Sequence, residues 1–324
     1  MELRPAPVIY REAAHRDFHS SAVRQLTQER LFMFVVTGAT GNTGSAVADT
    51  LLQLGKQVKV VVRDDAKGEA WKAKGAQVAI ADLDDSAALT AALKGAEGAY
   101  IMLPPVYGAP DFLAAGAKLS DAIARGIKES GVPYIVMLSS VGAQHPDGTG
   151  PIRNLHYAES VIPKAAPNAT FLRASYFIEN YAPVLGAAVG GGVLPSFFPA
   201  DFRLPMNATL DIGRIAADLL LHPAPGLRVV EMEGPAQYSP ADIVATLTTL
   251  LGKPVNVLEL PLAAVVPEFT KLGFTEDVAK LFAEMYAGIL SGHVSAPATG
   301  EHRKGTVTPQ EVLAGLLKAI PARA

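Results

Sequence analysis

Gly38-Ala39-Thr40-Gly41-Asn42-Thr43-Gly44 decides the fold, because it joins an apolar run at residues 34–36 to a helical pattern that ends near Gly55. A glycine-rich turn between a strand and a helix is the local setting in which backbone can hold phosphate groups. The first glycine makes the bend, Gly41 lets a pyrophosphate approach, and Gly44 lets the helix lie close to the strand. Free N–H groups at the helix start favour phosphate. The stretch therefore predicts a dinucleotide site rather than an ordinary strand-to-helix turn.

Short apolar runs alternate with helical patterns after this turn. Continuous apolar strands separated by helices indicate a parallel sheet covered on both faces. Right-handed crossovers then give an α/β fold with a doubly wound parallel sheet, the Rossmann fold, and ligands bind at the carboxyl ends of its strands. Strands are expected at residues 34–36, 58–62, 77–80, 100–103, 134–138 and 169–172, and helices at 112–130, 212–221, 240–251 and 276–290, with one more capped by Ser86.

The pattern divides the chain into three parts. Residues 1–31 are predicted to be a disordered or wrongly assigned extension, with a targeting peptide as the alternative, because acidic residues interrupt its arginines. Residues 32–175 are predicted to form the dinucleotide-binding domain. Beyond it, residues 186–199 are rich in glycine and proline. Residues 176–324 are therefore predicted to form a smaller C-terminal α/β substrate lobe that returns in part onto the sheet.

Composition excludes several classes of function. The 324 residues carry a net charge of −3 without a basic excess, so no nucleic-acid partner is expected. Cysteine is absent and the seven histidines lack ligand spacing, so no disulfide, thiol nucleophile or metal site is expected. No apolar run approaches the about 20 residues that span a bilayer. We expect a cytoplasmic protein without a membrane partner, and its oligomeric state stays open, with a homodimer as one possibility.

The end of the second strand bears on the choice of dinucleotide. An acidic residue there would bind the ribose 2′-hydroxyl of NAD(H), but this strand ends in Arg63, which could bind the 2′-phosphate of NADP(H). Asp64 follows at once and could serve a ribose instead, and a solvated surface arginine is the plainer alternative. The sequence favours NADP(H) and leaves NAD(H) open. After the third strand, Asp82 lies where an adenine amino group would bind, and Asp84 and Asp85 are expected to cap the next helix.

The usual acid–base pair of such reductases is missing. A lysine four residues after a tyrosine lowers the phenol pKa, so that the phenol can exchange a proton near neutral pH. None of the nine tyrosines has this lysine, and after Tyr157 the fourth position is Val161. Ser139 and Ser140 follow the fifth strand and are expected to shape the pocket. The catalytic residues therefore remain unknown from sequence.

Several stretches together resemble the NmrA-like branch of the atypical short-chain dehydrogenase/reductases. The most specific is Leu172-Arg173-Ala174-Ser175-Tyr176-Phe177-Ile178-Glu179-Asn180, which is similar to the LRxxxFxEN segment of that branch. The resemblance runs from about Met33 to the last helix near Leu316. The other stretches that carry it are residues 37–44, 61–64, 138–143, 155–159 and 233–235.

The resemblance implies a set of site residues and two kinds of function. Members reduce quinones, azo compounds or related electrophiles with NAD(P)H, or else bind the dinucleotide and report its redox state to a partner such as a transcription factor. By the resemblance, Leu103 and Ser139 would lie along the nicotinamide ribose, and Asp82 and Leu83 would hold adenine. The residues implied to hold the phosphates are Gly38, Thr40, Gly41, Asn42, Thr43, Gly44 and Arg63.

Four pocket residues remain open to two interpretations. His156 could donate a proton, since its ordinary pKa is about 6.5, or it could be a helix-face histidine bonded to residues 173–180. Tyr176, Phe177 and Asn180 could contact a flat substrate, with Tyr176 a second catalytic candidate, or they could pack the lobe onto the sheet. We predict a reductase that passes hydride from NADPH to a quinone or similar conjugated acceptor, with a redox sensor that acts through a protein partner as the alternative.

Overall fold

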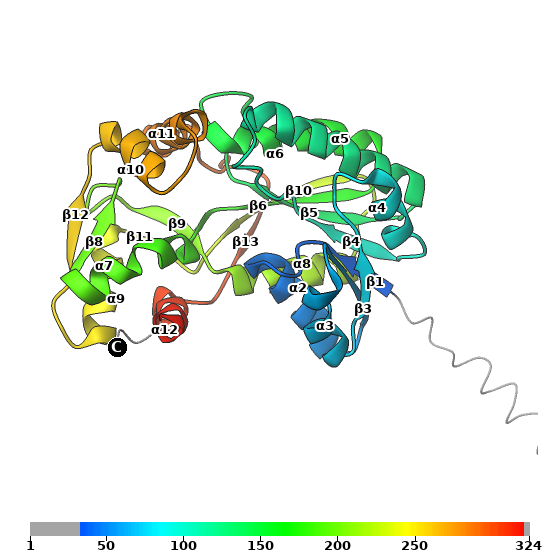
Figure 1. Cartoon of the computed structure of the whole chain (residues 1–324), viewed down its shortest axis with the longest axis horizontal. Coiled ribbons are helices and arrows are strands. Elements are labelled where there is room, and N and C mark those ends of the chain that lie inside the picture. The colour runs from blue at the N-terminus through cyan, green and yellow to red at the C-terminus, as the bar shows by residue number, and fades with distance from the viewer. Residues whose placement is uncertain (1–32, 321–324) are drawn as a thin grey trace, which may run out of the picture. The chain divides into compact units, whose positions relative to one another are not determined.

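A single sheet of eight parallel strands organises the computed structural model, which describes residues 33–320 (Figure 1). The interpretation of residues 1–31 lies outside these residues. The strands are β1 (Met33–Val36), β2 (Gln57–Val62), β3 (Gln77–Ile80), β4 (Gly98–Ile101), β5 (Ile135–Ser140), β6 (Ala169–Ala174), β10 (Leu227–Glu233) and β13 (Glu301–Lys304). Their order, β13-β10-β6-β5-β4-β1-β2-β3, confirms the predicted doubly wound parallel sheet.

Helices cover both faces of this sheet. Alternate residues of each strand point to opposite faces, so Val136 packs into the core beneath one helix layer, and Ile135 and Met137 pack beneath the other. The first layer holds α2 (Asn42–Gln53), α3 (Glu69–Ala73) and α8 (Thr209–Leu221), and the second holds α4 (Ser86–Leu93), α5 (Phe112–Ser130) and α6 (Arg153–Val161).

The chain reverses its direction across the sheet between β1 and β4. β2 and β3 lie on one side of β1, and β4, β5 and β6 lie on the other. Thr37 joins the two strand ends, because its hydroxyl donates to Tyr100 O at 3.1 Å and accepts from Met102 N at 3.0 Å. A crevice at this reversal is where doubly wound folds bind their ligands, and the glycine turn opens there.

The elements after β6, called the smaller lobe below, have a hydrophobic core of their own but belong to the same compact unit as the sheet. Ile178, Leu194 and Ile243 belong to the lobe's buried core. Two strands of this half, β10 and β13, return to the main sheet. The lobe's strands are β7 (Tyr176–Phe177), β9 (Leu204–Asn207) and β11 (Gln237–Tyr238) in one sheet and β8 (Val193–Ser196) and β12 (Asn256–Glu259) in another, with helices α7 (Leu185–Gly191), α9 (Pro240–Leu251), α10 (Val265–Lys271), α11 (Glu276–Leu290) and α12 (Pro309–Ala319). Short 3₁₀ helices are η1 (Asp65–Lys67), η2 (Gly150–Ile152), η3 (Ile162–Lys164), η4 (Ile178–Val184) and η5 (Leu262–Ala264).

Of the caps predicted for α4, Asp85 is confirmed, and Ser86 and Asp84 are wrong. Asp85, not Ser86, caps α4, because its carboxylate accepts from Ala87 N and Ala88 N at 3.0 Å each. The Asp85 carboxylate is in the N-cap position and is better placed to accept from these N–H groups than the Ser86 hydroxyl, which lies one residue later. Among residues 33–320, no helix combines the length and the apolar character that crossing a membrane requires.

Candidate functional site

The glycine turn has the geometry that its sequence predicted. Gly38 adopts φ 66°, a left-handed conformation that favours glycine, and a Cβ there would lie 2.5 Å from Met102 Cγ. A Cβ on Gly44 would overlap Gly38 O and lie 2.7 Å from Thr37 O. At Gly41 the nearest neighbour of a Cβ would be Gly38 O at 3.4 Å. The fold therefore requires glycine at positions 38 and 44, whereas a Cβ at Gly41 would make only an ordinary van der Waals contact.

The start of α2 fits a phosphate. Its N-cap is Gly41, which offers no side chain to the first N–H groups, and its first turn holds no acidic residue. Thr40, Gly41 and Asn42 are exposed, while Thr43 and Gly44 are buried beneath them. Unfilled N–H groups at a helix start bind anions through their hydrogens and the helix dipole.

The two charges at the end of β2 differ in their engagement. The Asp64 carboxylate accepts from Lys67 N at 3.0 Å and pairs with Lys67 Nζ at 3.2 Å. The backbone N–H of Lys67 holds the Asp64 pKa below its usual range. Arg63 is exposed and has no hydrogen bond or ion pair within residues 33–320. Arg63 is thus available to an anionic ligand. Asp82 is exposed and Leu83 is buried after β3, so of the two only Asp82 presents its side chain to solvent.

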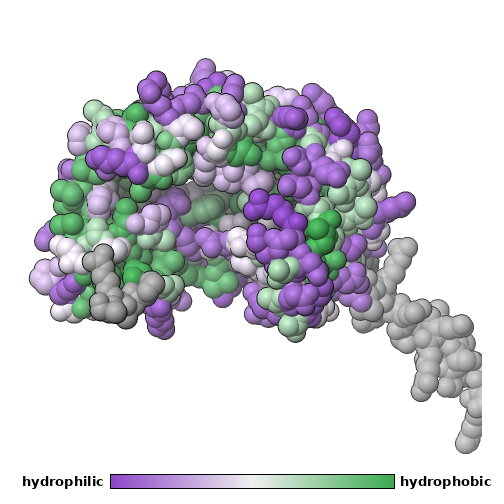
Figure 2. Space-filling view, viewed as in Figure 1, coloured by the Kyte–Doolittle hydropathy of each residue, from purple (hydrophilic) through white to green (hydrophobic). Residues whose placement is uncertain are grey.

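A cavity of about 670 Å³ adjoins the turn at the carboxyl ends of β4, β5, β6 and β10. Met102, which packs against Gly38, forms part of its wall. The smaller lobe and α11 supply the opposite wall through residues such as Leu204 and Met285. Hydrophobic residues are visible inside a hollow on the face drawn in Figure 2. Six of the residues predicted from sequence line this cavity: Leu103, Ser139, Ser140, Tyr176, Phe177 and Asn180.

Tyr176 is half-buried in an aromatic setting. Its ring packs edge-on against Phe198 and Tyr181, with centroids 5.7 and 6.3 Å apart. Burial raises the Tyr176 pKa well above its ordinary value, and the neighbouring Tyr286 and Tyr181 add to the shift. The phenol therefore stays protonated at neutral pH and cannot act as a base there.

His156 lies behind the cavity wall. Its Nδ1 is 2.8 Å from Ala143 O, and the residue is not among those that line the cavity. That contact differs from the predicted alternative of a bond to residues 173–180. His156 therefore does not contact the cavity.

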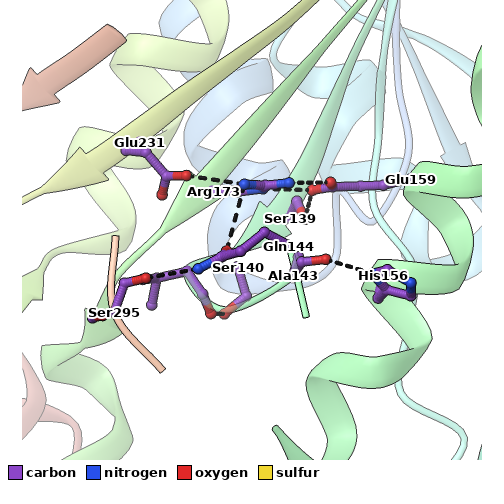
Figure 3. A network of polar contacts seen from close by, with 10 residues as sticks. Ser139, Ser140, Ala143, Gln144, His156, Glu159, Arg173, Glu231 and Ser295 are labelled. Atoms are coloured by element: carbon purple, nitrogen blue, oxygen red, sulfur yellow. Dashed lines mark hydrogen bonds and ion pairs between the residues drawn. The ribbon is translucent and has the colours of Figure 1, made fainter. Parts of the chain in front are cut away.

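An ion cluster that the sequence analysis missed lies beside the cavity (Figure 3). Arg173 forms a two-pronged pair with Glu159, at 3.0 Å to Oε1 and 2.6 Å to Oε2, and reaches Glu231 Oε1 at 3.1 Å. Ser139 donates its hydroxyl to Glu159 Oε1 at 2.6 Å. Burial raises the pKa of the Glu231 carboxyl, although Arg173 draws it down. Glu231 was detectable as the one charge in the buried run at residues 230–232.

Other polar groups have structural roles. Glu179 accepts from Thr209 N at 2.9 Å and from Thr209 Oγ1 at 2.7 Å, and so caps α8. Within residues 33–320 no group of three or more His, Asp or Glu side chains lies close enough to hold a metal ion.

The comparison with known proteins identifies the family. The model of the NmrA-like family matches residues 33–290. The chain belongs to the NmrA-like family. The predicted membership is thereby confirmed, and the match includes the glycine turn, Arg63 and the Arg173 cluster.

Two relatives of this NmrA-like chain extend over most of its length. An NAD(P)H azoreductase of Xenophilus azovorans is 27% identical over 297 residues, which cover 89% of this chain and 92% of the relative. Quinone oxidoreductase 2 of Escherichia coli strain K12 is 27% identical over 265 residues, or 80% and 89% of the two chains.

Solved structures agree with this fold. An NADPH-dependent quinone oxidoreductase of Escherichia coli, complexed with NADPH, has a TM-score of 0.74 at 25% identity over 88% of this chain and 100% of the other. A triphenylmethane reductase of Citrobacter sp. complexed with NADP(H), with a TM-score of 0.70 and 19% identity over 82% of this chain and 93% of the other, shares the fold.

Proposed function

We propose that this NmrA-like protein is an NADP(H)-dependent reductase that passes hydride to a quinone, an azo compound or a similar conjugated acceptor. The observation that carries the proposal is the contact between Gly38 and Met102, because it joins a phosphate-binding turn to a mostly apolar cavity. The azoreductase and quinone oxidoreductase relatives support the same reading.

Different residues of the site would bind different parts of the dinucleotide. The N–H groups at the start of α2 would hold the pyrophosphate, with Thr40, Asn42 and Thr43 beside them. Arg63 would bind the 2′-phosphate, since Asp64 is paired with Lys67. Bound NADPH supplies the hydride. Leu103 and Ser139 would lie along the nicotinamide ribose, and Asp82 beside adenine.

The cavity suits a flat acceptor. Tyr176 and Phe177 line it together with mostly apolar residues, so ring position and desolvation would supply most of the acceleration. A conjugated acceptor spreads the charge that arrives with the hydride, whereas a simple ketone yields an alkoxide that needs a proton at once. The high pKa of Tyr176 and the absence of a following lysine favour the conjugated class.

The direct test is NADPH consumption by the purified protein with a panel of quinones, azo dyes and simple ketones. We expect turnover with conjugated acceptors and none with ketones. Calorimetry measures NADPH binding in parallel. Binding without turnover of any acceptor would reject the reductase and leave the redox sensor, and absence of binding would reject both.

A further inference from the structure

Four polar residues form a row across neighbouring strands. Ser139 of β5 pairs in register with Arg173 of β6, Arg173 with Glu231 of β10, and Glu231 with His302 of β13. Residues paired in this way point to the same face of a parallel sheet. Ser139, Glu231 and His302 line the cavity, so the row forms one side of it.

Glu159 of α6 adds a second carboxylate beside Arg173, so that the row and Glu159 together hold two carboxylates and one arginine. The charged groups that face Glu231 are Arg173 from β6, Glu159 from α6 and His302 from β13. Glu159 takes the close two-pronged contact with Arg173, and its side chain and that of Arg173 are each 10% exposed. The side chain of Glu231 is 4% exposed and has a single contact with the same guanidinium. One arginine therefore faces two buried carboxylates.

The second oxygen of Glu231 has no partner. Oε2 is buried and makes no hydrogen bond within the described part of the chain, and it points away from Arg173 in Figure 3. Burying an unpaired carboxylate charge costs free energy, and a buried carboxyl group usually avoids this cost by binding a proton. Burial raises the Glu231 pKa in the same direction.

We propose that Glu231, which lines this cavity, is its proton donor: the buried carboxyl group carries a proton and, when the side chain turns toward the cavity, gives it to the acceptor oxygen or nitrogen that hydride transfer leaves negative. The inference rests on the proposed reductase function. Because Glu231 lies at the acceptor end remote from the hydride, it protonates a conjugated acceptor but not the alkoxide of a simple ketone, which forms at the carbon that takes the hydride.

The step balances in atoms and charge. A quinone-class acceptor gains a hydride, with both its electrons, from the reduced dinucleotide, and one proton from Glu231. The O–H bond of the carboxyl breaks as the O–H bond of the reduced acceptor forms, and Glu231 becomes a carboxylate. The exposed His302 neighbours Glu231 across the strand pair and opens a route for reprotonation from water.

The distance from Met102 to Glu231 across the cavity fits a nicotinamide and an acceptor placed one after the other. Met102, at the turn side, follows β4, and Glu231 lies three strands away on β10. At about 4.8 Å between strands this separation is roughly 14 Å. A nicotinamide over the β4 and β5 ends and an aromatic acceptor beyond it would bridge that span. The acceptor end remote from the hydride is then the end that meets Glu231.

The first test needs no cofactor. The infrared spectrum of the protein should contain a carboxylic-acid carbonyl band at neutral pH that Glu231→Gln removes. Glu179→Gln is the matched control, because Glu179 also has a buried oxygen without a partner but does not line the cavity. It should keep the band. Glu231→Leu serves if the glutamine variant does not fold, since it leaves Arg173 and Glu159 as a balanced pair. Identical bands in the wild type and either Glu231 variant would overturn the inference.

The second test uses the pH profile of quinone reduction. The wild-type rate should fall as pH rises through the Glu231 pKa, and Glu231→Gln should be about 100-fold slower with no such fall. Wild-type turnover that Glu231→Gln retains in full overturns the proton donor alone, whereas an inactive wild type overturns the reductase. The proton-donor role of Glu231 would also be overturned if the wild type lacked the carboxylic-acid band and Glu231→Gln lost affinity for a cationic dye. Glu231 would then be a buried anion that binds cations.

Discussion

At the end of β2, Arg63 and Asp64 are adjacent but differ in what they can bind. Asp64 caps η1 and pairs with Lys67, which leaves its carboxylate little capacity for a ribose hydroxyl. Arg63 extends into solvent without a partner in residues 33–320. The proposed binding of NADP(H) by this end of β2 thus rests on the Arg63 guanidinium more than on an absent acid.

Arg63→Gln should weaken NADPH binding about 10- to 100-fold, because a charge-assisted hydrogen bond contributes about 1.5–3 kcal/mol. NADH affinity should change little, since NADH lacks the 2′-phosphate. Calorimetric dissociation constants for both dinucleotides check this. Arg125→Gln, at an exposed arginine of α5, is the control. Equal weakening for NADPH and NADH would refute the assignment of Arg63 to the 2′-phosphate.

Alanine variants at two glycines of the turn should distinguish an effect on protein stability from an effect on NADPH binding. Gly44→Ala should destabilise the protein by about 1–3 kcal/mol, since its Cβ would overlap Gly38 O. Gly41→Ala should leave the unfolding free energy almost unchanged, because its Cβ meets only Gly38 O at 3.4 Å, yet it should weaken NADPH binding by blocking the phosphate. Urea unfolding and calorimetry on both variants measure the two effects. A Gly41→Ala variant with wild-type affinity would contradict the predicted approach of the pyrophosphate.

The Glu231 carboxyl should also affect stability in a pH-dependent way. Its folded pKa is raised by burial, so its contribution to stability is complete below the unfolded pKa and is lost as pH rises through the folded pKa. Glu231→Gln does not titrate. The unfolding free energy of Glu231→Gln, relative to that of the wild type, should therefore increase as pH rises above about 4.3. The increase should be about 1.4 kcal/mol for each unit by which the Glu231 pKa is raised. Urea unfolding over that pH range measures the difference, and a difference independent of pH would contradict the raised pKa.

At the scale of elements, local signals predicted helices well and long-range pairing poorly. The sequence predicted α5, α9 and α11 with their observed bounds, because N-cap residues and glycines mark their ends. The predicted strands were close to β1, β3, β5 and β6. The joining of β10 and β13 to the far edge of the sheet depends on pairings with distant residues, which no local pattern encodes. The polar row was missed for the same reason, since its members come from four separate strands.

The cap of α4 offers a matched pair of variants. Asp85→Ala should lower the unfolding free energy by about 1 kcal/mol, because it removes the acceptor for Ala87 N and Ala88 N. Ser86→Ala should change it by less than about 0.5 kcal/mol, since Ser86 is the first helical residue and not the cap. Thermal or urea unfolding distinguishes the two. A larger loss in Ser86→Ala than in Asp85→Ala would contradict the assignment of the cap to Asp85.

At the scale of the whole molecule, the segment beyond the family match closes one side of the cavity. The match ends at residue 290, whereas His302 of β13 lines the cavity. Asp211 of α8 holds the segment after β13, since its Oδ2 accepts from Thr306 N and Val307 N at 2.7 Å each. Its side chain is 4% exposed. A buried carboxylate on α8 therefore holds the segment that directly follows β13 and its residue His302.

Asp211→Ala should release this segment while the rest of the sheet stays folded. The two lost hydrogen bonds involve a charged acceptor, so the amides of Thr306 and Val307 should exchange with solvent about 10-fold faster or more. Asp211→Asn keeps the shape and one acceptor oxygen, and should lie between the wild type and the alanine variant. Because β13 carries His302 beside Glu231, reduction of quinones by Asp211→Ala should slow with NADPH affinity unchanged. Faster exchange without slower turnover would mean that β13 contributes to stability but not to the cavity's chemistry.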